Sequence, residues 1–281
     1  MGVKIRPLVE SDLEFAVELA NQEYWNYDLE DVRRLRFLFP SGCFVAEYDG
    51  ARAGWVVACT YGNLVWVSSL VVRDNLRGKG IGAALIDQLE RYSHSQGIRT
   101  IGLYSYRESV GFYERMGFKQ DSEFQHLEGS GQDTNAHGVT QQATDLSEVV
   151  RLDREYFHAN RAPLLKLLLE EHPRLLRNIR DTHLVGYIAG RSFSDNSAQI
   201  GPWVCETKQA IAAEQLFSSE VSQLKSKKIE LTIPSGNSDA HRIVEKYGFK
   251  VKQKVLRMFL GDSEDLPSNK GIYAAAGLDV G

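Results

Sequence analysis

The sequence has 281 residues and a formal net charge of -4, and 43% of its residues are hydrophobic and 25% charged. This composition is typical of globular proteins and excludes a largely disordered or fibrous chain. The small net charge provides no global field that would gather nucleic acid or an anionic membrane, so we expect a small-molecule or protein substrate.

The first half of the chain is expected to alternate between strands and helices. A strand at Val3–Arg6 precedes a helical stretch from Ser11 to Tyr24, and a tight Asp49-Gly50 turn joins the next two strands. A helix that reaches about Ser95 and a short helix that ends at Gly117 complete the pattern. Four further strands are expected at Cys43–Tyr48, Arg52–Tyr61, Leu64–Val72 and Arg99–Ser105. These elements predict an α/β (α+β) layered domain.

The second half repeats the first. Matching segments lie between 131 and 133 residues apart, so the two copies align almost without gaps. The matches are Asp12-Leu13 with Asp145-Leu146, Glu23-Tyr24-Trp25 with Glu155-Tyr156-Phe157, Gly54-Trp55 with Gly186-Tyr187, and 114–118 with 245–249. A small, polar stretch from Gly129 to Gly138 separates the copies and is typical of a linker. We therefore predict two domains, at residues 1–130 and 139–281.

The cysteines and the apolar runs bear on the location of the protein. Cys43, Cys59 and Cys205 lie far apart and form no CxxC pair, which favours buried thiols over disulfides or a metal site. The chain opens on the strand-like Val3–Arg6 rather than on a signal segment, and no apolar run approaches the roughly 20 residues of a membrane span. We expect a cytoplasmic protein with neither metal nor membrane partner.

A glycine-rich loop follows the strand at Leu64–Val72 and precedes the long helix. Gly78, Gly80 and Gly82 would let a ligand approach backbone N–H groups at the positive end of the helix dipole. Arg73, Arg77 and Lys79 add charge that can pair with phosphate oxygens. The loop alone is also compatible with an ordinary turn or a dinucleotide fingerprint. Its RxxGxG spacing differs from GxGxxG, and it lacks the GK[ST] end of a P-loop.

The strand and loop together resemble the GNAT acyltransferase superfamily, whose hallmark is [QR]xxGx[GA] after such a strand. The resemblance implies that acetyl-CoA is the cofactor and leaves as CoA. It implies that the main chain of Leu70, Val71 and Val72 pairs with the pantetheine arm, beside a V-shaped opening to the next strand. The loop residues implied to cradle the pyrophosphate are Arg77, Gly78, Lys79, Gly80, Ile81 and Gly82.

The repeat extends this resemblance over nearly the whole chain. The protein is similar to a tandem GNAT, with two acyl-CoA N-acyltransferase domains that are each a mixed, mostly antiparallel sheet flanked by helices. The second half resembles the YitH/HsdE-like C-terminal domain, and Gly271–Gly277 is the kind of ending that this group shows.

Tyr113 is the candidate catalytic residue. The resemblance implies that it faces the CoA sulfur, and a phenol stays protonated and able to donate at neutral pH. Tyr113 would otherwise be interpreted as a half-buried helix aromatic. The backbone amide near Val72 is implied to polarise the thioester carbonyl. The sequence departs from the family at Tyr106, where many members carry an asparagine.

No general base can be assigned from the sequence. Four residues are possible on position, although each is more often a solvated side chain or a strand residue. They are Glu23, Asp28, His126 and Glu128. A chain of water molecules could perform the same task.

The second copy has lost the motifs that carry the chemistry. Lys208–Ala213 matches the glycine loop but contains no glycine, and Val244 replaces the tyrosine, although Asn237 and Ala240 keep an NxxA pattern that the first copy lost. We expect this degenerate copy to pack on the first and to shape the acceptor site. Several aromatic and arginine side chains of the second copy could line that site, or could instead be ordinary core or solvated residues. They are Tyr156, Phe157, Arg161, Arg191 and Trp203. Trp25, Tyr27 and Trp66 of the first copy are open to the same two interpretations.

These patterns favour an N-acetyltransferase that transfers acetyl from acetyl-CoA to a primary amine of a small molecule or protein, by direct attack in a ternary complex. A non-catalytic acyl-CoA or metabolite sensor is the alternative. A transferase of longer acyl groups would need room beside Trp66, Ser68 and Ser69. Because two fused domains can replace a homodimer, a monomer is favoured.

Overall fold

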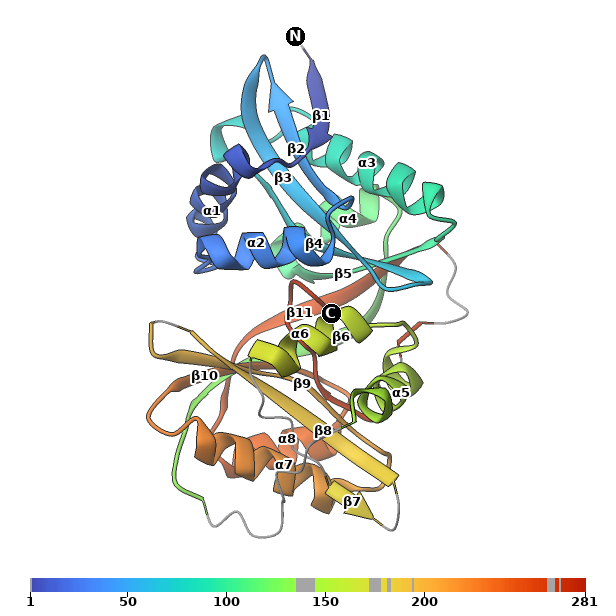
Figure 1. Cartoon of the computed structure of the whole chain (residues 1–281). Coiled ribbons are helices and arrows are strands. Elements are labelled where there is room, and N and C mark those ends of the chain that lie inside the picture. Colours follow the sequence, from blue (N-terminus) through green and yellow to red (C-terminus); the bar gives the residue numbers. More distant parts are fainter. Residues whose placement is uncertain are drawn as a thin grey trace.

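The computed structural model describes residues 2–134, 145–171, 178–180, 183–193, 195–261, 266–267 and 269–281. It consists of two similar halves stacked along one continuous sheet, with the C-terminal end near their junction (Figure 1). Helices flank the sheet in both halves, so the α/β layered class expected from the sequence is confirmed.

The first half contains six strands and four α-helices within the described residues. The strands are β1 (Val3–Pro7), β2 (Cys43–Tyr48), β3 (Ala51–Thr60), β4 (Leu64–Val72), β5 (Thr100–Tyr106) and β6 (Lys119–Ser130). The helices are α1 (Leu13–Gln22), α2 (Leu29–Leu38), α3 (Ile81–Ser95) and α4 (Val110–Arg115). Every strand and helix predicted for this half is present within a few residues of its predicted bounds.

The second half repeats this arrangement. Its helices are α5 (Leu146–Phe157), α6 (Ala162–Glu171), α7 (Ala210–Gln223) and α8 (Ser238–Lys246). Its strands are β7 (Asn178–Arg180), β8 (His183–Ser192), β9 (Ser197–Cys205), β10 (Lys228–Pro234), β11 (Lys250–Leu260) and β12 (Ile272–Ala274).

Helix α2 was not among the predicted elements, although its sequence carries a start signal. The Asp28 carboxylate accepts a hydrogen bond from the backbone N–H of Asp31, and the Asp31 carboxylate accepts one from the N–H of Asp28, both at 3.0 Å. This reciprocal capping box satisfies N–H groups that a helix start leaves unpaired. Val32 and Leu35 are then buried on the face of α2 that packs against the core.

The two halves exchange their last strands. The sheet order is β1-β2-β3-β4-β5-β11-β6-β10-β9-β8-β7, with β12 paired to β9, and all pairs are antiparallel except β4–β5 and β9–β10. Strand β11 therefore lies between β5 and β6, and β6 pairs with β10 (Figure 1). The sheet is thus continuous across the predicted boundary. The predicted start of the second domain at residue 139 lies outside the described residues, so the domain limits stay predictions.

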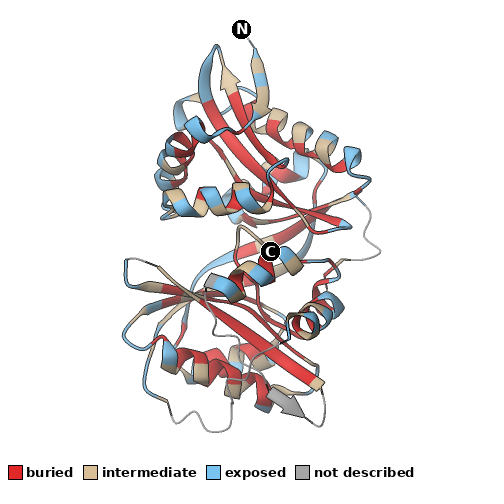
Figure 2. Ribbon diagram, viewed as in Figure 1, coloured by how far each residue is buried: buried red, intermediate tan, exposed pale blue. Residues whose placement is uncertain are grey.

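The hydrophobic core covers both faces of the sheet in each half (Figure 2). On the α1–α2 face of the first half, Trp55 and Trp66 are fully buried, and Phe157 from α5 packs into the same cluster, with its ring centroid 6.3 Å from that of Trp66. The halves therefore share core side chains as well as backbone pairing.

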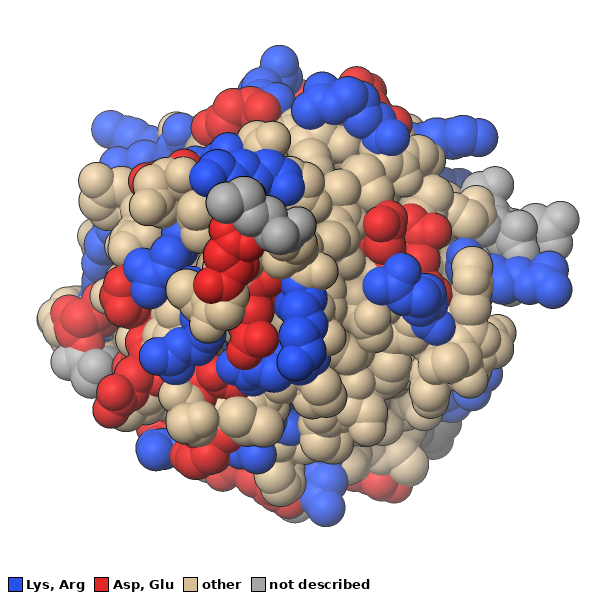
Figure 3. Space-filling model, turned by 90° about the horizontal axis from the view of Figure 1, so that it is seen from above, with Lys and Arg blue, Asp and Glu red and all other residues tan. Residues whose placement is uncertain are grey.

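The described residues include no helix that is both long enough and apolar enough to cross a membrane. On the face of the molecule that Figure 3 presents, positive and negative side chains are interspersed.

Candidate active site

The site begins where two neighbouring strands of the first half separate. Strands β4 and β5 are parallel neighbours, but they pair only at their beginnings, where Leu64–Trp66 of β4 lie opposite Thr100–Gly102 of β5. Beyond Trp66, β4 carries a bulge opposite β3. Its register with β3 shifts between the β3 residues Trp55 and Val57, and Ser69 of β4 has a left-handed φ of 54°. Because a bulge bends and twists its strand, β4 turns away from β5 and leaves the V-shaped opening that the resemblance implied.

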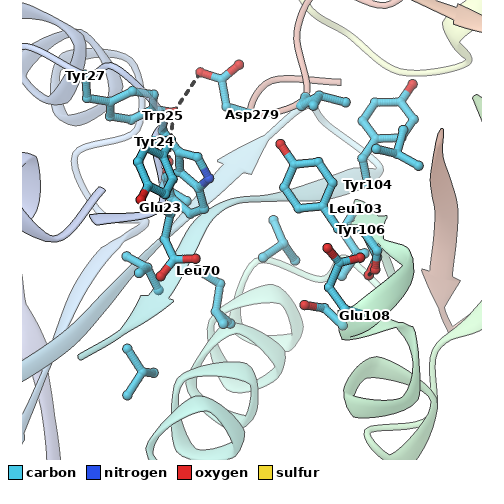
Figure 4. Close-up of a pocket in the computed structure, with 18 of the residues that line it drawn as sticks. Glu23, Tyr24, Trp25, Tyr27, Leu70, Leu103, Tyr104, Tyr106, Glu108 and Asp279 are labelled. Carbon is cyan, nitrogen blue, oxygen red and sulfur yellow. Dashed lines mark hydrogen bonds between the residues drawn. The ribbon is translucent and has the colours of Figure 1, made fainter. Parts of the chain in front are cut away.

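A cavity of about 1270 Å³ fills this opening and continues toward the second half. Leu70, Val71 and Val72 line one side, and Leu103–Tyr106 line the other. Figure 4 shows Leu70 beside the aromatic residues that follow α1, with Leu103, Tyr104 and Tyr106 across the space. The main chain of β4 next to the bulge therefore faces an open volume instead of a strand.

The glycine loop forms one end of this cavity. Gly78 and Gly80 have φ of 77° and 79°, which favours glycine, and no atom lies within 4 Å of a Cβ built at either position. Gly80 caps α3, and the first helical bond runs from the N–H of Ala84 to its carbonyl. The N–H groups of residues 81–83 thus lack partners within the helix, and these residues line the cavity. The local geometry is that of an anion site at a helix N-terminus.

Of the three predicted phosphate-binding cations, Arg77 lines the cavity and the other two point elsewhere. Arg77 forms ion pairs with Glu23 and with Asp74 at 2.9 Å, and its Nε donates to the Val72 carbonyl at 3.3 Å. The Lys79 ammonium lies over the Tyr48 ring at 5.0 Å. Arg73 pairs with a glutamate of α1. The local positive charge at the loop is therefore partly neutralised.

Tyr113 lies on the cavity wall, on α4. Its side chain packs between Phe112 and Phe118, with ring centroids 5.0 and 5.7 Å away, and only 9% of the residue is exposed. Burial raises the pKa of Tyr113 to about 12. Phe112 also closes the space over Gly82, where a Cβ would meet the ring at 3.2 Å. Tyr113 is thus a protonated phenol on the wall of the cavity that the glycine loop also lines.

The other end of the cavity is aromatic and polar. Trp25 and Tyr27 line it, and the Tyr27 hydroxyl lies 3.0 Å from Ser69 Oγ at the β4 bulge. The same hydroxyl donates to Asp279 Oδ2 at 3.1 Å, the dashed contact in Figure 4. Burial and the Asp279 carboxylate raise the pKa of Tyr27, so it remains a donor.

Both halves supply residues to this end of the cavity, but only some of the candidates from the second half line it. Arg191 on β8 lines the cavity. The other candidates pack or pair in the core. The Trp203 ring stacks on Phe217 at 4.9 Å, the Arg161 guanidinium pairs with Asp153 at 2.6 Å, and Phe157 and Tyr156 are buried. Trp66 is likewise a core residue.

The four candidate bases also lie in different surroundings. Glu23 lines the cavity but is paired with Arg77, and Asp28 caps α2. Glu128 lies outside the lining and pairs with Lys228 and Lys252, and Lys228 lowers its pKa. His126 lines the cavity, with Nδ1 3.0 Å from Thr232 Oγ1 and Nε2 3.6 Å from a Glu230 carboxylate oxygen.

The sequence prediction missed further lining residues from the second half, among them Asp279, Glu230 and Gln199. They reach the cavity of the first half through the continuous sheet and through the chain after β12. No local pattern marks them, because their positions depend on pairing between distant segments.

The equivalent opening in the second half is closed by the chain itself. Strands β9 and β10 pair at residues 197–199 and 228–230, as β4 and β5 do in the first half. Strand β12 then pairs with β9 at Trp203 and Val204, and the Ala275 N–H donates to the Thr232 carbonyl of β10 at 2.9 Å. The Tyr273 ring packs on Trp203 at 4.8 Å. This opening is already occupied, whereas the first is not filled by any described strand.

Comparisons with known proteins agree with this geometry. Residues 10–118 match the model of the acetyltransferase (GNAT) family, and residues 149–274 match an acetyltransferase (GNAT) domain model. A curated relative described as an uncharacterised N-acetyltransferase from Methanocaldococcus jannaschii is 29% identical over 140 residues. That match covers 41% of this chain and 60% of the relative, so the chain spans less than two thirds of the relative's length.

Solved structures share the whole fold. A candidate acetyltransferase from Pyrococcus horikoshii superposes with a TM-score of 0.83 at 20% identity, covering 100% of this chain and 96% of that one. A tandem GNAT protein from the clavulanic acid biosynthesis pathway superposes with a TM-score of 0.66 at 14% identity, covering 94% of this chain and 100% of that one. The two family models lie side by side on a fold shared with a tandem GNAT protein, and the chain therefore belongs to the acetyltransferase (GNAT) family, with two domains of that family in tandem.

Proposed function

We propose that the chain is an N-acetyltransferase that transfers acetyl from acetyl-CoA to a primary amine by direct attack in a ternary complex. The observation that carries this proposal is the combination, in the first half only, of an open V between β4 and β5 with unpaired N–H groups at the start of α3. The second half, where β12 fills the V, has no such opening in its described residues.

The residues present fit the cofactor. Residues 77–82 would hold the pyrophosphate, because two of their glycines leave open space and the first turn of α3 offers free N–H groups. Lys79 would have to turn from Tyr48 to take part. The main chain of Leu70, Val71 and Val72 would pair with the pantetheine arm. When bound, acetyl-CoA supplies the activated thioester.

The chain's own groups would then control charge and protons. The backbone N–H near Val72 would stabilise the negative charge that develops on the thioester carbonyl oxygen. Tyr113 would give its proton to the departing thiolate, and its pKa of about 12 keeps that proton in place throughout the physiological range. An acceptor amine would enter from the end lined by Trp25 and Tyr27.

The finer assignments rest on particular features. We infer that the second half is a YitH/HsdE-like domain, which the segment Gly271–Gly277 supports. The three cysteines are free and buried, which supports a reducing, cytoplasmic location. The strand exchange between the halves provides internally the pairing that two subunits otherwise share, which supports a monomer.

The test compares Tyr113→Phe with Tyr92→Phe in an assay of thiol release from acetyl-CoA with a panel of amino acids, polyamines, amino sugars and peptides. Removing the acid should lower kcat about 10²- to 10⁴-fold and leave acetyl-CoA binding by calorimetry unchanged. The Tyr92 hydroxyl meets Thr60 Oγ1 at 3.2 Å outside the cavity lining, so its loss should leave kcat unchanged.

Either of two results would contradict the proposal. Absence of acetyl-CoA binding to the intact chain would remove the cofactor assignment. Acetyl-CoA binding without turnover of any amine would favour the alternative of a non-catalytic acyl-CoA sensor, which the unusual Tyr106 supports.

A further inference from the structure

The proposed acceptor end of the cavity contains a cation and an anion whose hydrogen-bonding capacity the described residues use only in part. They are Arg191 on β8 and Asp279 in the segment after β12, and both line the cavity. Both come from the second half, yet they face the opening of the first. The inference drawn from them rests on the proposed function and narrows its acceptor.

Asp279 is held in place by a well-anchored segment. The Tyr61 hydroxyl donates to the Val280 carbonyl at 2.9 Å, the Arg161 guanidinium donates to the Gly281 carbonyl at 2.6 Å, and the Ala276 N–H donates to the same Gly281 oxygen at 2.9 Å. These contacts come from both halves. The segment is therefore part of the folded wall.

A short chain of hydrogen bonds connects Asp279 with the β4 bulge. The Tyr27 hydroxyl donates to Asp279 Oδ2 at 3.1 Å and lies 3.0 Å from Ser69 Oγ, which in turn lies 3.0 Å from Ser68 Oγ. Ser69 directly precedes Leu70, the first residue of the proposed pantetheine-binding strand. The carboxylate thus lies two hydrogen bonds from the place where an acetyl thioester would be presented.

Arg191 differs from the other buried arginines of the chain. Its side chain is only 17% exposed, and its buried Nε has no hydrogen-bond partner among the described residues. Its nearest carboxylate is Asp31, 3.8 Å from Nη1, and Asp31 already accepts a hydrogen bond from Arg34 at 3.0 Å. An unused buried N–H of a charged group is costly, which makes a missing anionic partner the natural explanation.

The contrast with Arg161 and Arg257 sharpens this interpretation. Arg161 donates to both oxygens of Asp153, at 3.1 and 2.6 Å. Arg257 donates to Asp121 at 2.7 Å and to the Pro267 carbonyl at 2.8 Å. Both have structural partners within the fold. Arg191 instead projects its guanidinium over the Phe193 ring at 4.5 Å, beside the cavity.

Two other charged side chains in the lining are already matched, Lys228 and Asp195. Lys228 pairs with Glu128 at 2.9 Å and with Glu230 at 3.0 Å. Asp195 accepts hydrogen bonds from Asn26 at 2.8 Å and from the Ser197 N–H at 2.9 Å.

We propose that the acceptor is a small zwitterion of the amino-acid type, whose carboxylate binds Arg191 and whose amine lies beside Asp279. A guanidinium fork matches a carboxylate in charge and geometry, and a carboxylate stabilises an ammonium at the entrance. Transfer forms the amide N–C bond and breaks the thioester C–S bond. Of the two protons that leave the ammonium nitrogen, one ends on the CoA sulfur by way of Tyr113 and the other passes to water.

The test uses pairs of amines that differ only in the carboxylate. Phenylalanine is compared with phenethylamine, leucine with isoamylamine, and lysine with cadaverine, after a screen of the standard L-amino acids by thiol release. For the preferred side chain, kcat/KM of the amino acid should exceed that of its decarboxylated partner roughly 10- to 100-fold, the effect of hydrogen bonds to a charged group.

Three variants separate the roles. Arg191→Gln should lower kcat/KM for the amino acid to that of its decarboxylated partner, and Asp279→Asn should raise KM for both members of a pair. Arg242→Gln removes a comparable charge from an exposed pair with Glu214, outside the cavity lining, and should change neither quantity. Equal use of both members of every pair, or a preference that survives Arg191→Gln, would overturn the inference.

The outcome remains distinct from that of the proposed function. If acetyl-CoA does not bind the intact chain, the proposed function fails, and binding of the free L-amino acids is then followed by saturation-transfer NMR. Loss of that binding in Arg191→Gln but not in Arg242→Gln would support the inference by itself. No binding of any amino acid, with acetyl-CoA or without it, would refute it.

Discussion

Replacing Gly80 by glutamate places a carboxylate at the cap of α3, where the cofactor pyrophosphate is proposed to bind. Gly80 has a φ of 79° with no atom within 4 Å of its virtual Cβ, so the Cβ of the new side chain meets no neighbouring atom. It would instead occupy the anion site and interact with the same N–H groups. Acetyl-CoA would then compete with a tethered negative charge.

The size of the effect follows from the charges. Two like unit charges about 5 Å apart repel by about 3 kcal/mol at an effective dielectric constant of about 20. Because Gly80 is exposed, solvent and salt should screen about half of this. Since about 1.4 kcal/mol is tenfold in affinity, we expect Kd for acetyl-CoA to rise about 10- to 100-fold in isothermal titration calorimetry.

Gly97 provides a matched control at the other end of the same helix. It is also exposed, with a φ of 73° and no atom within 4 Å of its virtual Cβ. Each substitution should cost about 1–2 kcal/mol for a left-handed non-glycine residue. The helix dipole favours a glutamate at Gly80 and disfavours one at Gly97, so Gly97→Glu should be the less stable variant and still bind normally. Unchanged binding in Gly80→Glu, or equal losses in both variants, would refute the assignment of the loop.

Three further predictions concern stability and assembly. The hydrogen bond from Arg6 lowers the pKa of the buried Asp12 carboxyl in the folded state. The ionised carboxylate therefore stabilises the fold above the pKa of about 3.9 that Asp12 has in the unfolded chain, and this stabilisation is lost as the pH falls through the lower folded-state pKa. Asp12→Asn should therefore cost about 1–3 kcal/mol in urea unfolding at pH 7 and progressively less as the pH falls below about 3.9, and a constant difference would contradict this. When residues 1–130 and 139–281 are produced as separate chains, each should be poorly folded, because each lacks a neighbour for its exchanged strand. The two chains should associate when mixed, which analytical sedimentation would detect. Two independently folded monomers would contradict this. Tyr273→Ala should cost about 3–5 kcal/mol by removing a buried ring from the filled opening of the second half, and a neutral change would show that β12 is only loosely placed.

Local patterns were sufficient to predict most of the first half. The strand at Leu64–Val72 and the helix that ends at Ser95 have the predicted bounds, because apolar continuity, glycine positions and helical periodicity are properties of neighbouring residues. Tyr113, which the family resemblance singled out, and the glycine loop line the same cavity. Their binding and catalytic roles stay proposals.

The exchange of strands could not be predicted in this way. Strands β6 and β11 follow equivalent helices of the repeat, so either one could serve as the neighbour of β5 on local grounds. Which pairing wins is decided by contacts between segments more than a hundred residues apart. Asp279 and Arg191 reach the cavity only through that long-range arrangement, and the sequence had offered Arg191 merely as one of two ambiguous arginines.

The position of β11 also affects how the protein can be made. During translation, β6 leaves the ribosome about 130 residues before β11 does, and β5 leaves earlier still. At roughly 5–20 residues per second, the nascent first half would wait on the order of 10 s for the strand that separates them. Throughout that interval β5 and β6 present strand edges that could pair with each other or with another nascent chain. The tandem gene thus couples completion of the first half to synthesis of the second, and we expect chaperones that shield strand edges to raise the yield of folded protein.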